Sequence, residues 1–147
     1  MSSRGAKRRP VLAALLAAVL ALSLSAQIPS LESLIEAGHW RRAKAAAEAL
    51  LRTSPDDPMV QFLTARCLDA AGDLDGAQAL AEKASASDPR NAGYHALLAY
   101  LHARQAQGAG ILRQAVLARR IRKEAETALA LDPRSLEALV ILIEFYR

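Results

Sequence analysis

The sequence predicts an all-α protein built from stacked helical hairpins, and three observations support this prediction. The apolar residues follow the i, i+3, i+4 spacing of amphipathic helices. Aromatic residues make up only 4% of the chain, while alanine and leucine are abundant, a composition that favours closely packed helices over a sheet. Several small or turn-forming residues also recur at an interval of 34 positions: Gly38 and Gly72, Ala43 and Ala77, Ala47 and Ala81, Pro55 and Pro89.

The first 26 residues have the pattern of a secretory signal peptide. Four basic residues and no acid precede an apolar run from Val11 to Leu24, and small residues follow it. The run has about 14 residues, fewer than the roughly 20 needed to span a membrane. We therefore expect export, with a periplasmic location. A retained anchor facing the periplasm stays open as the alternative, as does the choice between the general secretory and twin-arginine routes.

Charge and cysteine content limit what the rest of the chain does. Four of the 19 basic residues lie in the leader, which leaves 15 to balance the 15 acidic residues. A neutral domain gives no reason to expect nucleic acid, whose binding requires neutralising several phosphates. Cys67 is the single cysteine, so no internal disulfide can form. The domain of residues 27–147 must be held together by packing alone.

Two regular repeats are predicted, at about residues 27–57 and 58–91. In the first, Gly38 separates a short helix from a second helix over Trp40 to Thr53. In the second, a helix over residues 58–71 is followed by Gly72 and by a helix that Asp73 caps. Small residues are expected where the paired helices cross, because compact side chains permit close approach.

The third unit, at about residues 92–135, is longer than the others. Pro89 and Pro133 are 44 positions apart rather than 34, and Gly108 to Gly110 forms a turn. Sharing the ten extra residues equally predicts about 5 more in each helix and a projecting hairpin. The second helix should pack through an apolar stripe, comprising Ile111, Ala115, Ala118, Ile121, Ala125, Ala128 and Leu129.

A partial repeat is predicted at residues 136–147, consisting of one helix from Leu136 to Tyr146 without a partner helix. Its sequence is apolar on nearly all sides, whereas a terminal capping helix should be polar on its outer face. Self-association through this helix is therefore a further expectation.

The 34-residue period, the paired glycines, the alanines and the Asp-Pro punctuation resemble the tetratricopeptide-repeat family. The resemblance implies a right-handed solenoid of helical hairpins with an extended third hairpin and a final unpaired helix. The sequence departs from the family at its usual bulky aromatic, where Ala47 and Ala81 stand, and at its early tryptophan, where Gln61 and His95 stand. The chain further resembles an uncharacterised group of exported bacterial members, which implies that it is a short form or an incomplete reading frame.

By the same resemblance, the first helix of each repeat lines a concave groove. The repeat register places Ala96 there together with eight candidate residues for peptide binding: Met59, Phe62, Arg66, Asp69, Tyr100, Arg104, Val140 and Glu144. Aromatic side chains in such a groove can anchor a peptide, while arginines orient a carboxylate. The alternative for each residue is simple packing between repeats. The lysines and asparagines with which chaperone-binding members hold a terminal carboxylate are not in these positions.

No motif for catalysis, a cofactor or a metal stands out in the sequence. His95 and His102 are seven residues apart on one helix, about 10.5 Å along its axis, which is too far for one metal ion. Asp73 and Asp75 resemble the start of a calcium loop without its later ligands. We therefore expect no enzyme activity, no cofactor and no metal.

A cluster of basic residues surrounds the third hairpin, namely Arg104, Arg113, Arg119, Arg120, Arg122 and Lys123. Two interpretations stay open for it: an ordinary solvated helix face, or a surface for an anionic membrane or an acidic protein. The function predicted overall is a scaffold or adaptor that binds a protein or peptide in the bacterial cell envelope. The alternative is the recognition module, or a fragment, of a larger repeat protein, enzyme or assembly.

Overall fold

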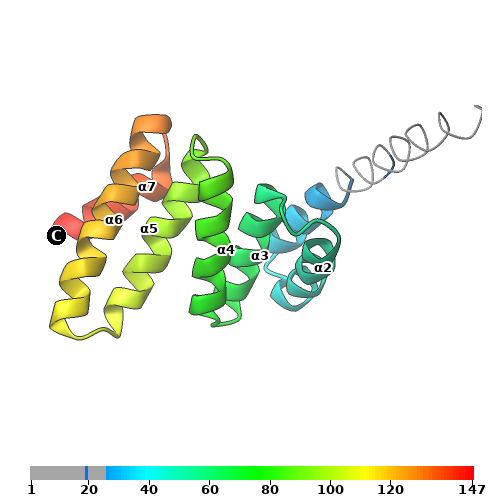
Figure 1. The fold of residues 1–147 in the computed structure, drawn as a ribbon, viewed down its shortest axis with the longest axis horizontal. Helices are drawn as coiled ribbons and strands as arrows, with labels where there is room; N and C mark the ends of the chain where they lie inside the picture. The colour runs from blue at the N-terminus through cyan, green and yellow to red at the C-terminus, as the bar shows by residue number, and fades with distance from the viewer. Residues whose placement is uncertain (1–18, 20–25) are drawn as a thin grey trace, which may run out of the picture.

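The computed structural model describes residue 19 and residues 26–147, and the regular secondary structure of these residues is entirely α-helical (Figure 1). The predicted signal peptide falls almost wholly outside the described residues. After a helical segment at residues 26–36 come six helices: α2 (Trp40–Thr53), α3 (Pro58–Ala70), α4 (Leu74–Ser87), α5 (Ala92–Gln107), α6 (Ile111–Leu131) and α7 (Leu136–Tyr146). They form three hairpins and a final single helix, as the sequence predicts. None of the described helices combines the length and the apolar character needed to cross a membrane.

The turns inside the first two hairpins depend on glycine. Gly38 and Gly72 have φ angles of +71° and +87°, in the left-handed region that residues with a Cβ atom rarely adopt. At the second turn, the amide of Asp73 donates to the carbonyl of Leu68 at 2.9 Å, which closes the end of α3. The Asp73 side chain then accepts from the Gly76 amide at 2.9 Å and caps α4.

The core runs along the stack as three clusters instead of gathering at one centre. The first hairpin packs on α3 through Leu31, Ala47 and Leu63, among others. The second cluster joins α3 and α4, which contribute alanines, to α5, which contributes leucines: Ala65, Ala77, Ala81, Leu97, Leu98 and Leu101. Ala96, Ala128 and Ala138 form the third, where α5, α6 and α7 meet. Each hairpin thus buries its apolar side against a neighbour.

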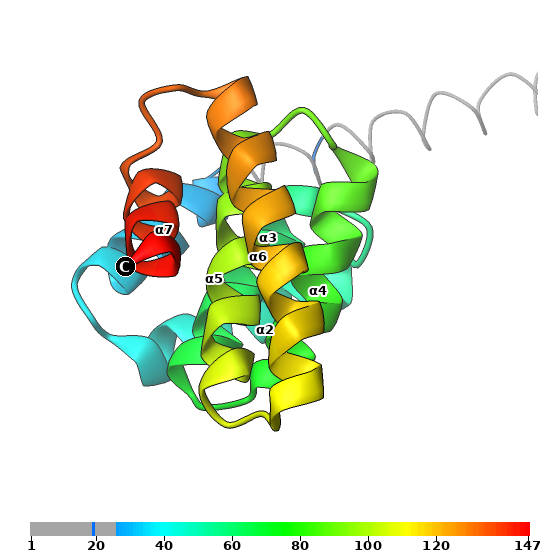
Figure 2. The same ribbon diagram turned by 90° about the vertical axis from the view of Figure 1, so that its left-hand side faces the viewer.

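The third hairpin is extended, but the extra residues are not shared equally. α5 has 16 residues against 13 in α3, whereas α6 has 21 against 14 in α4. The prediction of about equal lengthening is therefore wrong. Most of the insertion lengthens α6, which runs from the turn at one end of the molecule to the loop that leads into α7 (Figures 1 and 2).

The packing stripe predicted for α6 is wrong over its first two turns. Ile111 is 85% exposed and Ala115 is also exposed, while Leu117, Ile121, Ala125 and Ala128 are the buried residues. The sequence contains two apolar stripes at helical spacing here. The helix presents the one that includes Leu117 to α5, and this leaves Ile111 in solvent.

Candidate functional site

A groove of about 700 Å³ lies between three first helices of the repeats. It is lined by Trp40, Phe62, Arg66, Asp69, Ala70, Ala96, Leu97, Tyr100, Arg104, Leu136, Glu137, Val140 and Ile141. Phe62 to Ala70 come from α3, Ala96 to Arg104 from α5 and Leu136 to Ile141 from α7. Figure 2 shows α7 beside α5 at this end of the stack.

The groove brings together most of the residues that the repeat register selects. Phe62, Arg66, Asp69, Ala96, Tyr100, Arg104 and Val140 all line it. Met59 does not, since its side chain packs against the first core cluster. Glu144 also lies outside the lining, on an exposed part of α7, where its carboxylate is 3.9 Å from the Arg147 guanidinium.

Trp40 is the main lining residue that the register misses. It is the first residue of α2 and is 39% exposed. The repeat register selects positions on the first helix of each repeat only, and Trp40 begins a second helix. A large aromatic residue at the exposed start of a helix is the signal that points to it.

The apolar part of the groove is broad and accessible. Tyr100 is 42% exposed and Val140 57% exposed. Phe62 packs against the buried ring of Tyr94, and the two ring centroids are 5.1 Å apart. Such a contact fixes one face of the Phe62 ring. Large side chains that are open to solvent but held in place suit the capture of an apolar group from a ligand.

The two arginines of the groove have different environments. The Arg104 guanidinium pairs with the Asp69 carboxylate across the gap between α3 and α5. Arg66 instead lies over the Phe62 ring, with its guanidinium carbon 5.8 Å from the ring centroid. No carboxylate pairs with Arg66 in the part of the chain that the structure describes. Arg66 is therefore the arginine that can accept a ligand carboxylate without breaking an ion pair.

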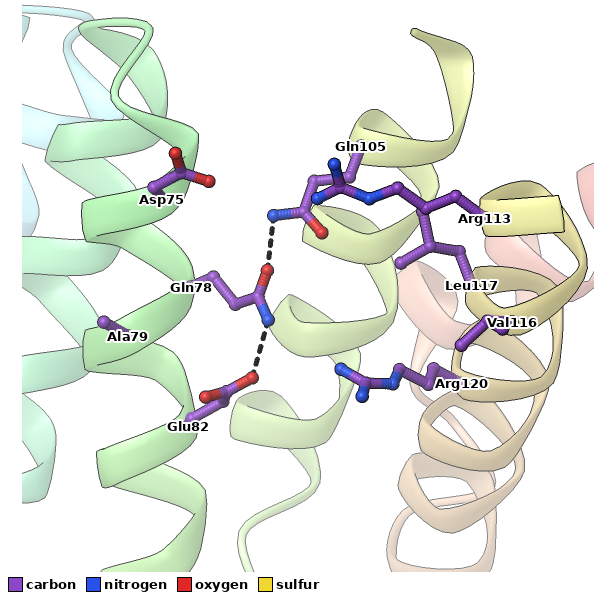
Figure 3. Close-up of a pocket in the computed structure, with 9 residues that line it drawn as sticks. All are labelled: Asp75, Gln78, Ala79, Glu82, Gln105, Arg113, Val116, Leu117 and Arg120. Atoms are coloured by element: carbon purple, nitrogen blue, oxygen red, sulfur yellow. Dashed lines mark hydrogen bonds between the residues drawn. The ribbon is translucent and has the colours of Figure 1, made fainter. Parts of the chain in front are cut away.

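A second, smaller hollow of about 440 Å³ opens between α4 and α6 (Figure 3). Asp75 and Glu82 stand on the α4 side, and Arg113 and Arg120 reach from α6. Gln78 donates to Glu82 at 2.6 Å and accepts from Gln105, so a chain of hydrogen bonds joins Gln105 of α5 to Glu82 of α4. With acids on one wall and bases on the other, this hollow favours neither an anion nor a cation.

The histidines and the cysteine lie apart from the groove. His95 faces the Glu124 carboxylate at 2.7 Å and the Pro89 carbonyl at 3.0 Å. His102 is buried in α5, and burial lowers its pKa. Burial raises the pKa of Cys67 to about 11, so its thiol is protonated at neutral pH. Among the described residues, no group of three or more His, Cys, Asp and Glu side chains is arranged to hold a metal ion.

Comparison with known proteins identifies the class of fold. Residues 34–101 match the tetratricopeptide-repeat family model, and this stretch covers α2, α3, α4 and most of α5. Residues 34–101 thus carry the tetratricopeptide repeats that the 34-residue period predicts. A search among curated protein sequences gives no significant match.

Solved structures share the fold at low sequence identity. TTC0263, a thermophilic tetratricopeptide-repeat protein of Thermus thermophilus, superposes with a TM-score of 0.77 at 18% identity, over 84% of this chain and 64% of that one. The second such domain of human RPAP3, in complex with the HSP70 peptide SGPTIEEVD, gives 0.69 at 12% identity, over 87% of this chain and 98% of that one. An O-GlcNAc transferase of Thermobaculum terrenum gives 0.74 at 22% identity, over 86% and 22%. The chain thus spans less than two thirds of the length of two of these three.

Proposed function

We propose that this protein is a non-catalytic scaffold that binds a segment of another protein in the groove between α3, α5 and α7. The observation that carries the proposal is an accessible apolar groove in which Arg66 lies over Phe62 and has no carboxylate partner among the described residues. The fold neighbours support it, since the RPAP3 domain is in complex with an HSP70 peptide and the first domain of Spaghetti is bound to an HSP90 peptide.

The groove favours a particular kind of segment. Phe62, Tyr100 and Val140 would contact an apolar side chain of the ligand, and Arg66 would pair with a carboxylate beside it. Arg104 would act differently from the role that the sequence suggests, because its ion pair with Asp69 fixes the wall between α3 and α5. A short acidic and apolar peptide is therefore the expected ligand class.

Selection from a random peptide library on the immobilised full chain tests this proposal. Enriched peptides should bind Arg66→Ala and Tyr100→Ala at least about tenfold more weakly, since buried arginine and aromatic anchors dominate such interfaces. Arg90→Ala, in the exposed loop before α5, is the matched control and should bind normally. Circular dichroism checks that each variant is folded. Equal binding of the selected peptides to all four proteins would rule out the groove as the site.

The cell envelope is the proposed setting, and this part rests on the sequence of residues 1–26 alone. An alkaline phosphatase fused after Arg147 in a bacterial host should be active, because the enzyme folds only when exported to an oxidising compartment. Deleting residues 1–26 should abolish that activity. Activity without the leader would contradict the proposal.

A second proposal is that these repeats are the recognition part of a larger protein or assembly. The uncovered apolar side of α7 favours it, because Leu136 is 75% exposed and Ile143 64% exposed. In a longer repeat protein, a further helix would pack on this side and bury these side chains. Reading the coding DNA past the codon for Arg147 tests this directly. Continued repeats or a catalytic domain would support the proposal, and an immediate stop codon would count against it.

A further inference from the structure

The turn between α5 and α6 exposes large apolar side chains at one end of the molecule. We call residues 108–116 the hairpin tip. Ile111 is 85% exposed and Leu112 86% exposed, and Val116, one turn further along α6, is 53% exposed. The tip is the lowest part of the ribbon in Figure 2. Adjacent large apolar residues exposed to this degree at a turn indicate a surface that contacts something other than water.

Basic residues follow the tip along the outer side of α6. Leu112, Val116, Arg119 and Lys123 are spaced by four, three and four residues, so they share one face of the helix. That face points away from the buried residues Leu117 and Ile121. Along the helix axis, the apolar end therefore comes first, and Arg119 and Lys123, which we call the cation collar, follow it. About 10.5 Å separates Leu112 from Arg119 along the axis.

The electrostatic field at this end is positive. The sequence has no Asp or Glu from Pro89 to Lys123, although it has seven Lys and Arg there. Arg113, Arg119 and Arg120 make no ion pair within the part of the chain that the structure describes. The N-terminus of α6 adds to the field, because its first turn has no acid and Gly110 provides no side-chain cap.

We propose that the hairpin tip inserts into the interface of an anionic lipid membrane. Amphipathic elements at membrane surfaces bury their apolar side chains about 5–10 Å deep, which matches the distance from Leu112 to the cation collar. Ile111 and Leu112 would enter the acyl boundary, and Arg119 and Lys123 would meet lipid phosphates. A protein surface with acidic groups would attract the cations equally but offers no general reason for two apolar residues at the extreme end.

A tryptophan placed at the tip tests the insertion directly. The only native tryptophan, Trp40, lies in the groove, so Leu112→Trp in a Trp40→Phe background reports on the tip alone. Leu131→Trp in the same background is the matched control, because Leu131 is exposed at the other end of α6. A local reporter is needed because the apolar N-terminal run of the full chain can itself bind vesicles.

Vesicles of phosphatidylglycerol and phosphatidylcholine should shift the emission of the Leu112→Trp reporter to shorter wavelength. Lipids brominated near the headgroup end of the acyl chain should quench it, and the Leu131→Trp control should show neither effect. Adding Arg119→Gln and Lys123→Gln should weaken tip insertion on the order of 20-fold, because each cation near an anionic surface contributes roughly fivefold. Pure phosphatidylcholine should give little effect.

Three results would overturn the proposal. A tip reporter that stays in water on anionic vesicles would exclude insertion. An emission shift produced by poly-glutamate and not by vesicles would assign the surface to an acidic protein. A shift that grows with protein concentration in the absence of lipid would show that a second copy of the chain covers the tip.

Discussion

At the scale of single residues, the structure distinguishes side chains that the sequence treats alike. Arg66 and Arg104 both line the groove, from α3 and α5, yet Arg104 pairs with Asp69 and Arg66 lies over an aromatic ring. His95 and His102 lie on the same helix, yet one faces a carboxylate and the other is buried. Repeat register predicts where a side chain points, and the partner is set by what the neighbouring repeat places opposite it.

His102 makes stability depend on pH. Its Nδ1 has no hydrogen-bond partner among the residues that the structure describes. Burial, followed by the positive charge of Arg120, lowers its pKa, with Glu124 and Glu82 opposing the shift. The unfolded chain therefore binds a proton more readily than the folded one. Stability is full above the ordinary value of 6.5 and is lost as the pH falls from there toward the lowered value in the folded state.

The substitution His102→Leu should remove this loss of stability at low pH. Urea denaturation of wild type and variant at about pH 7.5 and about pH 5.5 gives the free energies of unfolding needed for the comparison. The drop between the two conditions should be smaller in the variant, while His95 is unchanged in both proteins. An identical drop would show that His102 does not contribute to it.

At the scale of the helices, the sequence predicts boundaries well and packing faces less well. The bounds of α2 and α7 agree with the predicted ones because glycine, proline and capping residues act locally. The buried face of α6 could not be predicted in the same way, since Ile111 and Leu117 both begin apolar stripes. The choice between them depends on how α6 packs against α5, which the sequence of α6 does not specify by itself.

The turn at Gly72 provides a test of the local signals. Gly72→Ala should lower the free energy of unfolding by about 1–2 kcal/mol, because a Cβ disfavours a positive φ even where no atom lies close. Gly108→Ala is the matched control: Gly108 also has open space around it, but its φ is −105°. The control should be neutral or slightly stabilised. Equal losses in the two variants would contradict the role of the backbone angle.

At the scale of the whole molecule, the sequence predicts that there is a groove but not all of the residues that line it. The 34-residue period places α3 and α5 along one wall, and the Asp-Pro stop at Pro133 adds α7 to it after the longer third unit, which is why most of the candidate residues meet. Met59 and Glu144 fail for geometric reasons, since Met59 turns toward the first core cluster and Glu144 lies beyond the end of the trough. Trp40 enters because a solenoid also exposes the ends of its second helices.

The apolar side of α7 leads to a prediction about assembly. Light scattering should show an average mass that increases with concentration, because Val140, Ile143 and Tyr146 are more than half exposed. Ile143→Glu should weaken this association at least about tenfold by placing a charge in the contact. Ala130→Glu, at an exposed position of α6, serves as control. A constant mass for the wild-type chain would mean that α7 does not associate.

The stacking of each hairpin on its sequence neighbours alone has a mechanical consequence. Residues at opposite ends of the chain share no core cluster, so no contact among the described residues closes the array on itself. Stretching or bending therefore strains only the seams between adjacent units. An array of this kind deforms elastically, so the groove can widen or narrow to fit a bound ligand without the unfolding of any single hairpin.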